Sequence, residues 1–159
     1  MDMKEEWLAR FGQIEAEKRG LERCNALTEK YGLSLTGAQM ERLAAGRSRA
    51  LRAAGRVEFG PGILPKLVLA FRDSPYLEQH CYEETLAGLQ DLFYQLKNRC
   101  GEGLADDELV TAMKLLHDGP GGGDLDFLAG VPADLLCQIG RTGSLRGTEW
   151  EEELWDEEW

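Results

Sequence analysis

The chain has 159 residues, of which 43% are hydrophobic and 30% charged, and its formal net charge is −11. This composition is typical of a globular protein and excludes a collagen-like, mucin-like or wholly disordered chain. A chain of this length buries about two-thirds of its unfolded surface, so it needs neither disulfides nor a metal to fold. These quantities restrict the class of protein without selecting a function.

The sequence shows no targeting or membrane segment. Residues 1–6 lack the positive start and apolar core of a secretory signal. The longest strictly apolar run is 67–71, whereas a membrane span needs about 20 such residues. We therefore expect a cytoplasmic protein without a membrane segment. Its four cysteines are then expected to be reduced thiols: Cys24, Cys81, Cys100 and Cys137.

The N-terminal segment 1–31 is predicted to be a helical arm. Met3, Trp7, Phe11 and Ile14 recur at helical spacing and form one apolar stripe. Glycine weakens a helix by about 1 kcal/mol relative to alanine, so a break near Gly20 is expected. The apolar stripe is a candidate contact with a second copy of the chain, which makes a homodimer a possible assembly.

Residues 32–140 are predicted to form the helical core. Thr36 and Gln39 have the spacing of a capping box at the start of a helix that ends at Gly55. Residues 56–59 allow at most one short strand. Further helices are expected over 63–72, from Tyr82 to Cys100, from Asp106 to Asp118, from Asp124 to Leu128, and from Pro132 to about Gly140. A linker (141–147) and a flexible acidic Trp-rich tail (148–159) follow. The predicted fold is an all-α, single-domain bundle of five to seven helices.

Charge is unevenly distributed along the chain. Residues 147–159 carry seven carboxylates and no base, whereas residues 37–56 carry five arginines and one glutamate. Outside 147–159, the other 146 residues together carry a net charge of only −4. Nucleic-acid binders show an excess of base over the whole domain, so the sequence disfavours a nucleic-acid partner.

Several segments resemble an uncharacterised bacterial protein family, a domain of unknown function. They are RVEFGPGILPK (56–66), DSPY (73–76), LFY (92–94) and DDEL (106–109). The resemblance covers roughly residues 25–140 and implies a small intracellular bacterial protein. It supplies no activity, cofactor or catalytic residue, and the Trp-rich tail departs from what the resemblance leads us to expect.

The acidic tail suggests a non-enzymatic protein–protein interaction or regulatory module. Exposed tryptophan in a soluble tail is unfavourable unless it docks onto a surface. The surrounding carboxylates would direct it to a surface rich in basic residues. The expected anchors are Trp150, Leu154, Trp155 and Trp159. The expected acceptor is a basic, apolar groove on a partner, or the chain's own arginine face formed by Arg42, Arg49, Arg52 and Arg56.

An alternative is a small-molecule or anion-binding protein, or an enzyme. A Gly-Pro-Gly turn before a helix can present free N–H groups to an anion, although the phosphate-loop pattern is absent. The candidate ligand-binding residues are Gly60, Gly62, Lys66, Asp73, Ser74 and Tyr76.

Other reactive residues are interpreted as structural. The pair His80-Cys81 and the possible neighbours Cys100 and His117 lack the spacing of a zinc site. Asp118, Asp124 and Asp126 around the Gly-rich loop fail the EF-hand pattern. We therefore predict no metal, no cofactor and no catalytic residue.

Overall fold

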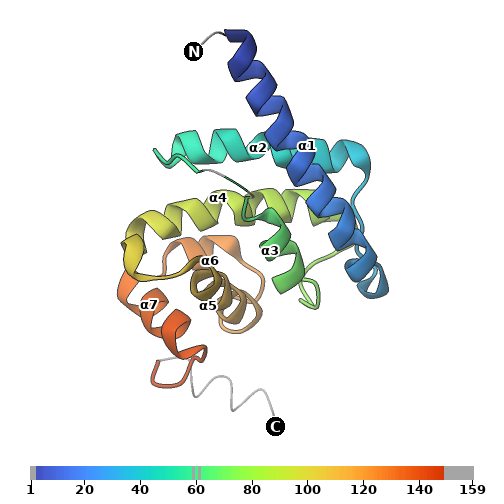
Figure 1. Ribbon diagram of the computed structural model, residues 1–159. Helices are drawn as coiled ribbons and strands as arrows, with labels where there is room; N and C mark the ends of the chain where they lie inside the picture. Colours follow the sequence, from blue (N-terminus) through green and yellow to red (C-terminus); the bar gives the residue numbers. More distant parts are fainter. Residues whose placement is uncertain (1–2, 59, 61, 149–159) are drawn as a thin grey trace.

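A computed structural model of the protein describes residues 3–58, 60 and 62–148. The described residues form seven α-helices, three short 3-10 helices and no strand, which confirms the all-α, single-domain prediction (Figure 1). Residues 56–58, considered for a strand, are irregular. The α-helices are α1 (Met3–Thr28), α2 (Gly37–Ala53), α3 (Leu64–Ala70), α4 (Tyr82–Cys100), α5 (Asp106–Asp118), α6 (Leu125–Ala129) and α7 (Ala133–Thr142). The 3-10 helices are Glu29–Tyr31, Gln79–Cys81 and Gly101–Gly103.

Helix α4 is the centre of the bundle. It contacts α2, α3, α5, α6 and α7, and it lies across the middle of the molecule in Figure 1. Leu86, Leu89 and Leu96 repeat at helical spacing and are completely buried. The apolar residues whose spacing predicts this helix are therefore the residues that pack against the neighbouring helices.

Helix α1 is continuous, so the predicted break near Gly20 is wrong. A side-chain carbon placed on Gly20 would lie 3.3 Å from Cγ of Pro65 on α3. The glycine allows α3 to approach α1 closely, and this tertiary contact offsets its low helix propensity. Helical propensity alone gives no account of such a contact.

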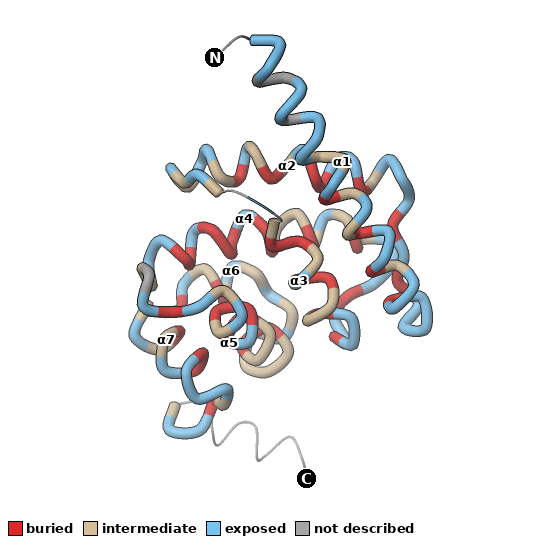
Figure 2. The backbone as a smooth tube through the Cα atoms, in the orientation of Figure 1, coloured by how far each residue is buried: buried red, intermediate tan, exposed pale blue. Residues whose placement is uncertain are grey.

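The first half of α1 projects beyond the bundle (Figures 1 and 2). Met3 is 83% exposed, and Leu8 and Phe11 are about half exposed. The same helix buries Leu21 and Cys24 further along, where α2 and α3 cover it. Helix α1 therefore carries apolar side chains in its first half as well, where α2 and α3 do not bury them. From here on, the arm means residues 3–16, the exposed first half of α1, and not the whole segment 1–31 that was predicted to be a helical arm.

The helix ends follow the sequence closely. Thr36 Oγ1 accepts a hydrogen bond from Gln39 N, and Gln39 Oε1 accepts one from Thr36 N. This is the predicted capping box. The predicted linker 141–147 is partly structured, because α7 extends to Thr142 and Leu145 is 3% exposed in the core. The helices of the described part of the chain are too short or too polar to cross a membrane.

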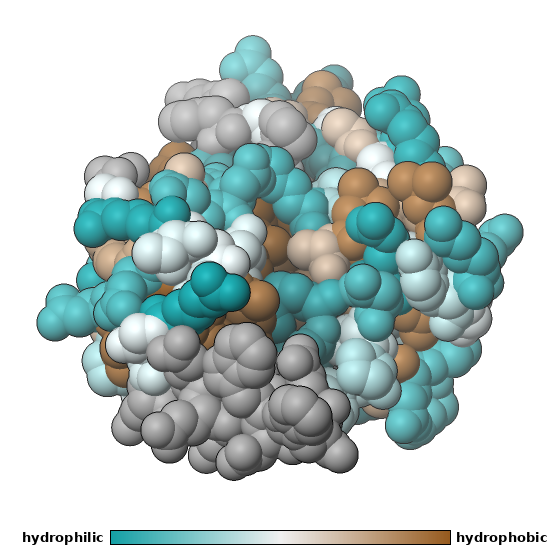
Figure 3. Space-filling view, turned by 90° about the horizontal axis from the view of Figure 1, so that it is seen from below, coloured by the Kyte–Doolittle hydropathy of each residue, from teal (hydrophilic) through white to brown (hydrophobic). Residues whose placement is uncertain are grey.

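The surface seen from below is largely hydrophilic. Outside the atoms drawn in grey, hydrophilic residues separate smaller hydrophobic areas (Figure 3). All four predicted anchors of the tail lie outside the described residues: Trp150, Leu154, Trp155 and Trp159. The candidate acceptor surfaces lie within them.

Candidate functional site

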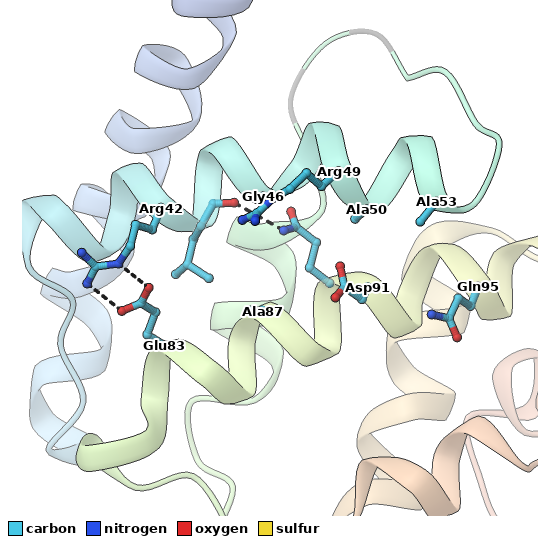
Figure 4. A pocket seen from close by; sticks show the side chains of 11 residues that line it. Arg42, Gly46, Arg49, Ala50, Ala53, Glu83, Ala87, Asp91 and Gln95 are labelled. Carbon is cyan, nitrogen blue, oxygen red and sulfur yellow. Dashed lines mark hydrogen bonds and ion pairs between the residues drawn. The ribbon is translucent and has the colours of Figure 1, made fainter.

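One open groove lies between α2 and α4, and we call it the α2–α4 groove. Its volume is about 450 Å³. Small residues on both helices, such as Gly46, Ala50 and Ala87, leave this space open (Figure 4). A groove with an apolar floor and charged side chains at its edge is a plausible acceptor for an aromatic anchor.

The edge of the α2–α4 groove contains two of the predicted arginines, each beside a carboxylate. Arg42 donates to both oxygens of Glu83, at 2.8 and 2.9 Å (Figure 4). Burial raises the pKa of Asp91, and the positive charge of Arg49 opposes that rise. The two arginines are thus balanced by two acids, and the edge carries no net positive charge.

The other two predicted arginines lie outside the α2–α4 groove. Arg52 is exposed in the last turn of α2. Arg56 donates to Asn98 Oδ1 at 2.9 Å. The structure therefore brings together two members of the predicted arginine face, and it balances their charge within the fold.

Gln90 supplies a buried polar atom to the α2–α4 groove. Its side chain is 1% exposed, and Nε2 donates to Leu43 O at 3.4 Å. Its Oε1 has no hydrogen-bond partner. The sequence gives no signal for this residue, because a glutamine on an amphipathic helix is ordinarily exposed.

A second, larger groove of about 790 Å³ runs along α1, and we call it the α1 groove. It extends from Ala9 to Leu27, about 27 Å along the helix axis. Gly60, Gly62 and Leu69 border it on the other side. Its length and mostly apolar or small lining are suited to a helix laid along α1.

A buried cluster of charges lies at the base of the α1 groove. Arg47 is 5% exposed and donates to Glu58 Oε1 from Nε at 3.0 Å and from Nη2 at 2.7 Å. Nη2 also donates to the carbonyl of Gly60 at 2.9 Å. Tyr94 donates to the same Glu58 oxygen at 2.8 Å, and burial raises the pKa of its hydroxyl. These contacts join α2, α4 and the segment before α3.

Glu17 is the unusual member of this cluster. Its side chain is 2% exposed and its Oε2 lies 4.0 Å from Arg47 Nη1. Its Oε1 faces Gly62 and has no hydrogen-bond partner. Burial raises the pKa of Glu17 to about 7, although Arg47 opposes the rise. A carboxyl group with an unused acceptor therefore lines the α1 groove.

The predicted ligand-binding residues do not form one pocket. Gly60 and Gly62 border the α1 groove. Lys66 instead pairs with Asp107 on α5 at 2.8 Å. Asp73 accepts a hydrogen bond from Lys114. Helix α3 lies between the two halves of the predicted site. It begins beside α1 and ends beside α5, so the residues before it and after it lie on different surfaces.

The residues Ser74, Asp118 and His117 meet, but in an order unsuited to nucleophilic catalysis. Ser74 Oγ donates to Asp118 Oδ1 at 2.6 Å, and His117 Nδ1 lies 2.7 Å from the same oxygen. A serine nucleophile requires the histidine, not the aspartate, as its hydrogen-bond partner. His117 is 1% exposed and packs edge-on against Phe71 and Tyr76. The arrangement fastens the segment after α3 to the end of α5.

The remaining reactive residues have structural contacts. His80 Nδ1 lies 3.1 Å from Glu78, and Asp124 caps α6 by accepting from Asp126 N at 2.9 Å. Cys100 neighbours Cys137, and burial raises the pKa of the Cys100 thiol to about 11. Cys100 on α4 therefore contacts α7. Within the described residues, His, Cys, Asp and Glu side chains form no group suited to hold a metal ion.

Residues 20–145 match DUF6323, a family of unknown function. The chain belongs to this family. The DUF6323 match confirms the predicted membership of an uncharacterised family, and it extends beyond the predicted range of 25–140. It begins at Gly20, where α1 meets α3, so the arm and the acidic tail lie outside it. No curated protein and no solved structure matches the chain.

Proposed function

We propose that this protein is a non-enzymatic protein–protein interaction module. The observation that carries the proposal is the arm, which projects from the bundle with Met3, Leu8 and Phe11 exposed (Figure 1). Most helical stability in proteins comes from the packing of an apolar face, so a partner that covers the arm would stabilise it. We therefore regard the arm as one docking element.

The acidic tail is the second docking element in this proposal. The anchors are Trp150, Trp155 and Trp159, and the carboxylates between them direct the tail to a basic surface. Because the edge of the α2–α4 groove is balanced in charge, we favour a basic groove on another protein over the chain's own arginine face. The four free thiols and the sequence resemblance support a bacterial, cytoplasmic setting.

The proposal is tested by cross-linking the full-length protein in cells and identifying what is captured. We expect the set of captured proteins to shrink in the variant Met3→Glu/Phe11→Glu and in a variant with all three tail tryptophans changed to alanine. Val57→Glu is the matched control, because Val57 is 80% exposed and lies outside both elements. Identical capture by all four proteins would contradict an interaction role for the arm and the tail.

The alternative of a small-molecule site would be placed in the α1 groove. Gly60 and Gly62 border that groove, and Glu17 offers it a buried acceptor. A ligand selective for the folded state must raise the melting temperature. A metabolite that raises the melting temperature of the wild type, but not of Glu17→Ala, would favour this alternative.

A further inference from the structure

We propose that Cys100 and Cys137 form a redox modification site, at which a low-molecular-weight disulfide reversibly oxidises the two thiols to an intramolecular disulfide. Cys100 is the last residue of α4, and Cys137 lies in the middle of α7. Their side chains share a hydrogen bond. A site of this kind agrees with the reduced state expected for a cytoplasmic protein, because disulfides in that compartment are ordinarily transient.

The hydrogen bonds of the four thiols distinguish this pair from the other two cysteines. Cys24 and Cys81 each donate to a backbone carbonyl, whereas Cys100 and Cys137 interact with each other. Cys24 is also buried, at 5% exposure, whereas Cys100 and Cys137 are both partly exposed. A small oxidant in solution can therefore reach two sulfurs that already lie in contact.

Neighbouring hydrogen bonds hold α4 and α7 in place around the two thiols. Arg99, next to Cys100, donates to the carbonyl of Ala129 at the end of α6. Arg141 on α7 donates to the carbonyl of Gly103, in the turn that follows α4, at 3.4 Å. Neither contact involves sulfur, so both can persist after oxidation. We therefore expect the disulfide to form by rotation of the two cysteine side chains, without movement of the helices.

The protonation of the pair gives each sulfur a different role. Burial raises the pKa of Cys100 to about 11, and the hydrogen bond with Cys137 acts in the same direction. The positive charges of Lys97 and Arg99 oppose this rise. Because Cys100 keeps its proton, Cys137 is the sulfur that attacks the oxidant, and Cys100 completes the reaction.

The reaction proceeds through a mixed disulfide. The Cys137 thiolate forms a bond to one sulfur of the small disulfide, and the other sulfur leaves as a thiolate. Cys100 then gives its proton to that thiolate, and its sulfur attacks Cys137 and displaces the second small thiol. In total, two protein thiols are oxidised to one disulfide, and one small disulfide is reduced to two thiols.

The disulfide would join the end of the central helix to the last helix of the bundle. It closes a loop over residues 100–137, which contains α5 and α6. A cross-link of this length stabilises a protein chiefly by restricting the unfolded chain. We therefore expect the melting temperature of the oxidised protein to exceed that of the reduced protein by roughly 5–10 °C.

Oxidation of the full-length protein with glutathione disulfide, followed by alkylation and mass spectrometry, tests the site. Trypsin cleaves after Arg99, Lys114 and Arg141, so the disulfide joins peptide 100–114 to peptide 115–141. We expect these joined peptides from the folded wild type, at a yield about tenfold higher than from protein oxidised in guanidinium chloride, because the fold holds the two thiols together. Excess reduced glutathione should separate them again.

Single variants test the two roles. Cys100→Ser should accumulate glutathione bound to Cys137, because the second attack is lost. Cys137→Ser should bind glutathione at Cys100 about tenfold more slowly, because that thiol keeps its proton. Neither variant should gain melting temperature on oxidation. Cys81→Ser is the matched control, because Cys81 is also partly exposed, and it should form the disulfide as the wild type does.

Three results would overturn the site. They are the absence of the joined peptides from the folded wild type, equal yields from folded and unfolded protein, and a disulfide that involves Cys24 or Cys81 instead. Faster reaction of glutathione disulfide at Cys100 than at Cys137 would overturn the assignment of the two roles. All of these results would leave the docking role of the arm and the tail to the cross-linking experiment.

Discussion

Arg47 and Tyr94 donate hydrogen bonds to the same carboxylate oxygen, Glu58 Oε1, from two different helices. The segment that bears Glu58 has no regular secondary structure of its own. Its position therefore depends on this shared acceptor and on the Arg47 contact with the Gly60 carbonyl. The shared acceptor ties α2, α4 and the wall of the α1 groove together.

Removal of Glu58 should destabilise the fold strongly. In Glu58→Ala, Arg47 becomes a nearly buried charge without its main partner, and we expect the free energy of unfolding to fall by about 2–3 kcal/mol. Glu83→Ala removes an acid whose partner, Arg42, is 61% exposed, so the expected loss is much smaller. Urea denaturation measures both, and equal losses would contradict the structural role of the buried pair.

Glu17 should make stability depend on pH near neutrality. Burial raises the pKa of Glu17 from 4.5 to about 7, so the folded protein keeps a proton that the unfolded chain has lost. The stabilisation from this group is complete below about pH 4.5 and is lost as pH rises through about 7. Glu17→Gln removes this dependence, and its stability relative to the wild type should rise by up to roughly 3 kcal/mol between about pH 5 and pH 8. Parallel stability profiles for the two proteins would refute the raised pKa.

Two glycines should respond oppositely to alanine. A side-chain carbon on Gly140 would lie 2.8 Å from the carbonyl oxygen of Glu108, where α7 crosses α5. Gly140→Ala should therefore destabilise the protein by about 2 kcal/mol. Gly46 lies within α2 and would make ordinary contacts at 3.6 Å, so Gly46→Ala should stabilise the protein by about 1 kcal/mol. Thermal unfolding decides, and a stabilising shift for Gly140→Ala would show that the α5–α7 crossing is looser than described.

Ser74 should be unreactive towards serine-hydrolase reagents. Its hydroxyl donates to Asp118, and the same carboxylate contacts His117, so the histidine is not placed to take the serine proton. Burial would raise the pKa of Asp118, but hydrogen bonds from His117, Ser74 and Lys114 lower it. Mass spectrometry after treatment with a fluorophosphonate should find no adduct on Ser74, with a known hydrolase as the positive control. An adduct at Ser74 would require a reactive arrangement different from the one described.

The sequence predicts the elements that depend on local chemistry. The capping box at Thr36 and the leucine periodicity of α4 each act within a few residues, so their effects appear directly in the sequence. Both are present as predicted. The break expected at Gly20 is wrong because a contact with Pro65, which is distant in the sequence, favours the glycine there.

The candidate sites were harder to predict because they are formed by charged residues that lie far apart in the sequence. Glu17, Arg47 and Glu58 are of types that are normally exposed, and no periodic pattern relates them. The fold places them together in the interior. Conversely, Gly60 and Asp73 are near in sequence yet belong to different surfaces, because α3 separates them. Proximity in the chain is a poor guide wherever a short helix changes its direction.

The start of α1 and the end of α7 lie on opposite sides of the molecule (Figure 1). The two docking elements proposed above, the arm and the segment that follows α7, therefore start from opposite sides of the bundle. A protein with these two elements can hold two separate targets at once, or one extended target at two points, in which case the second contact would form at a high local concentration. Weak individual contacts would then be sufficient for durable capture.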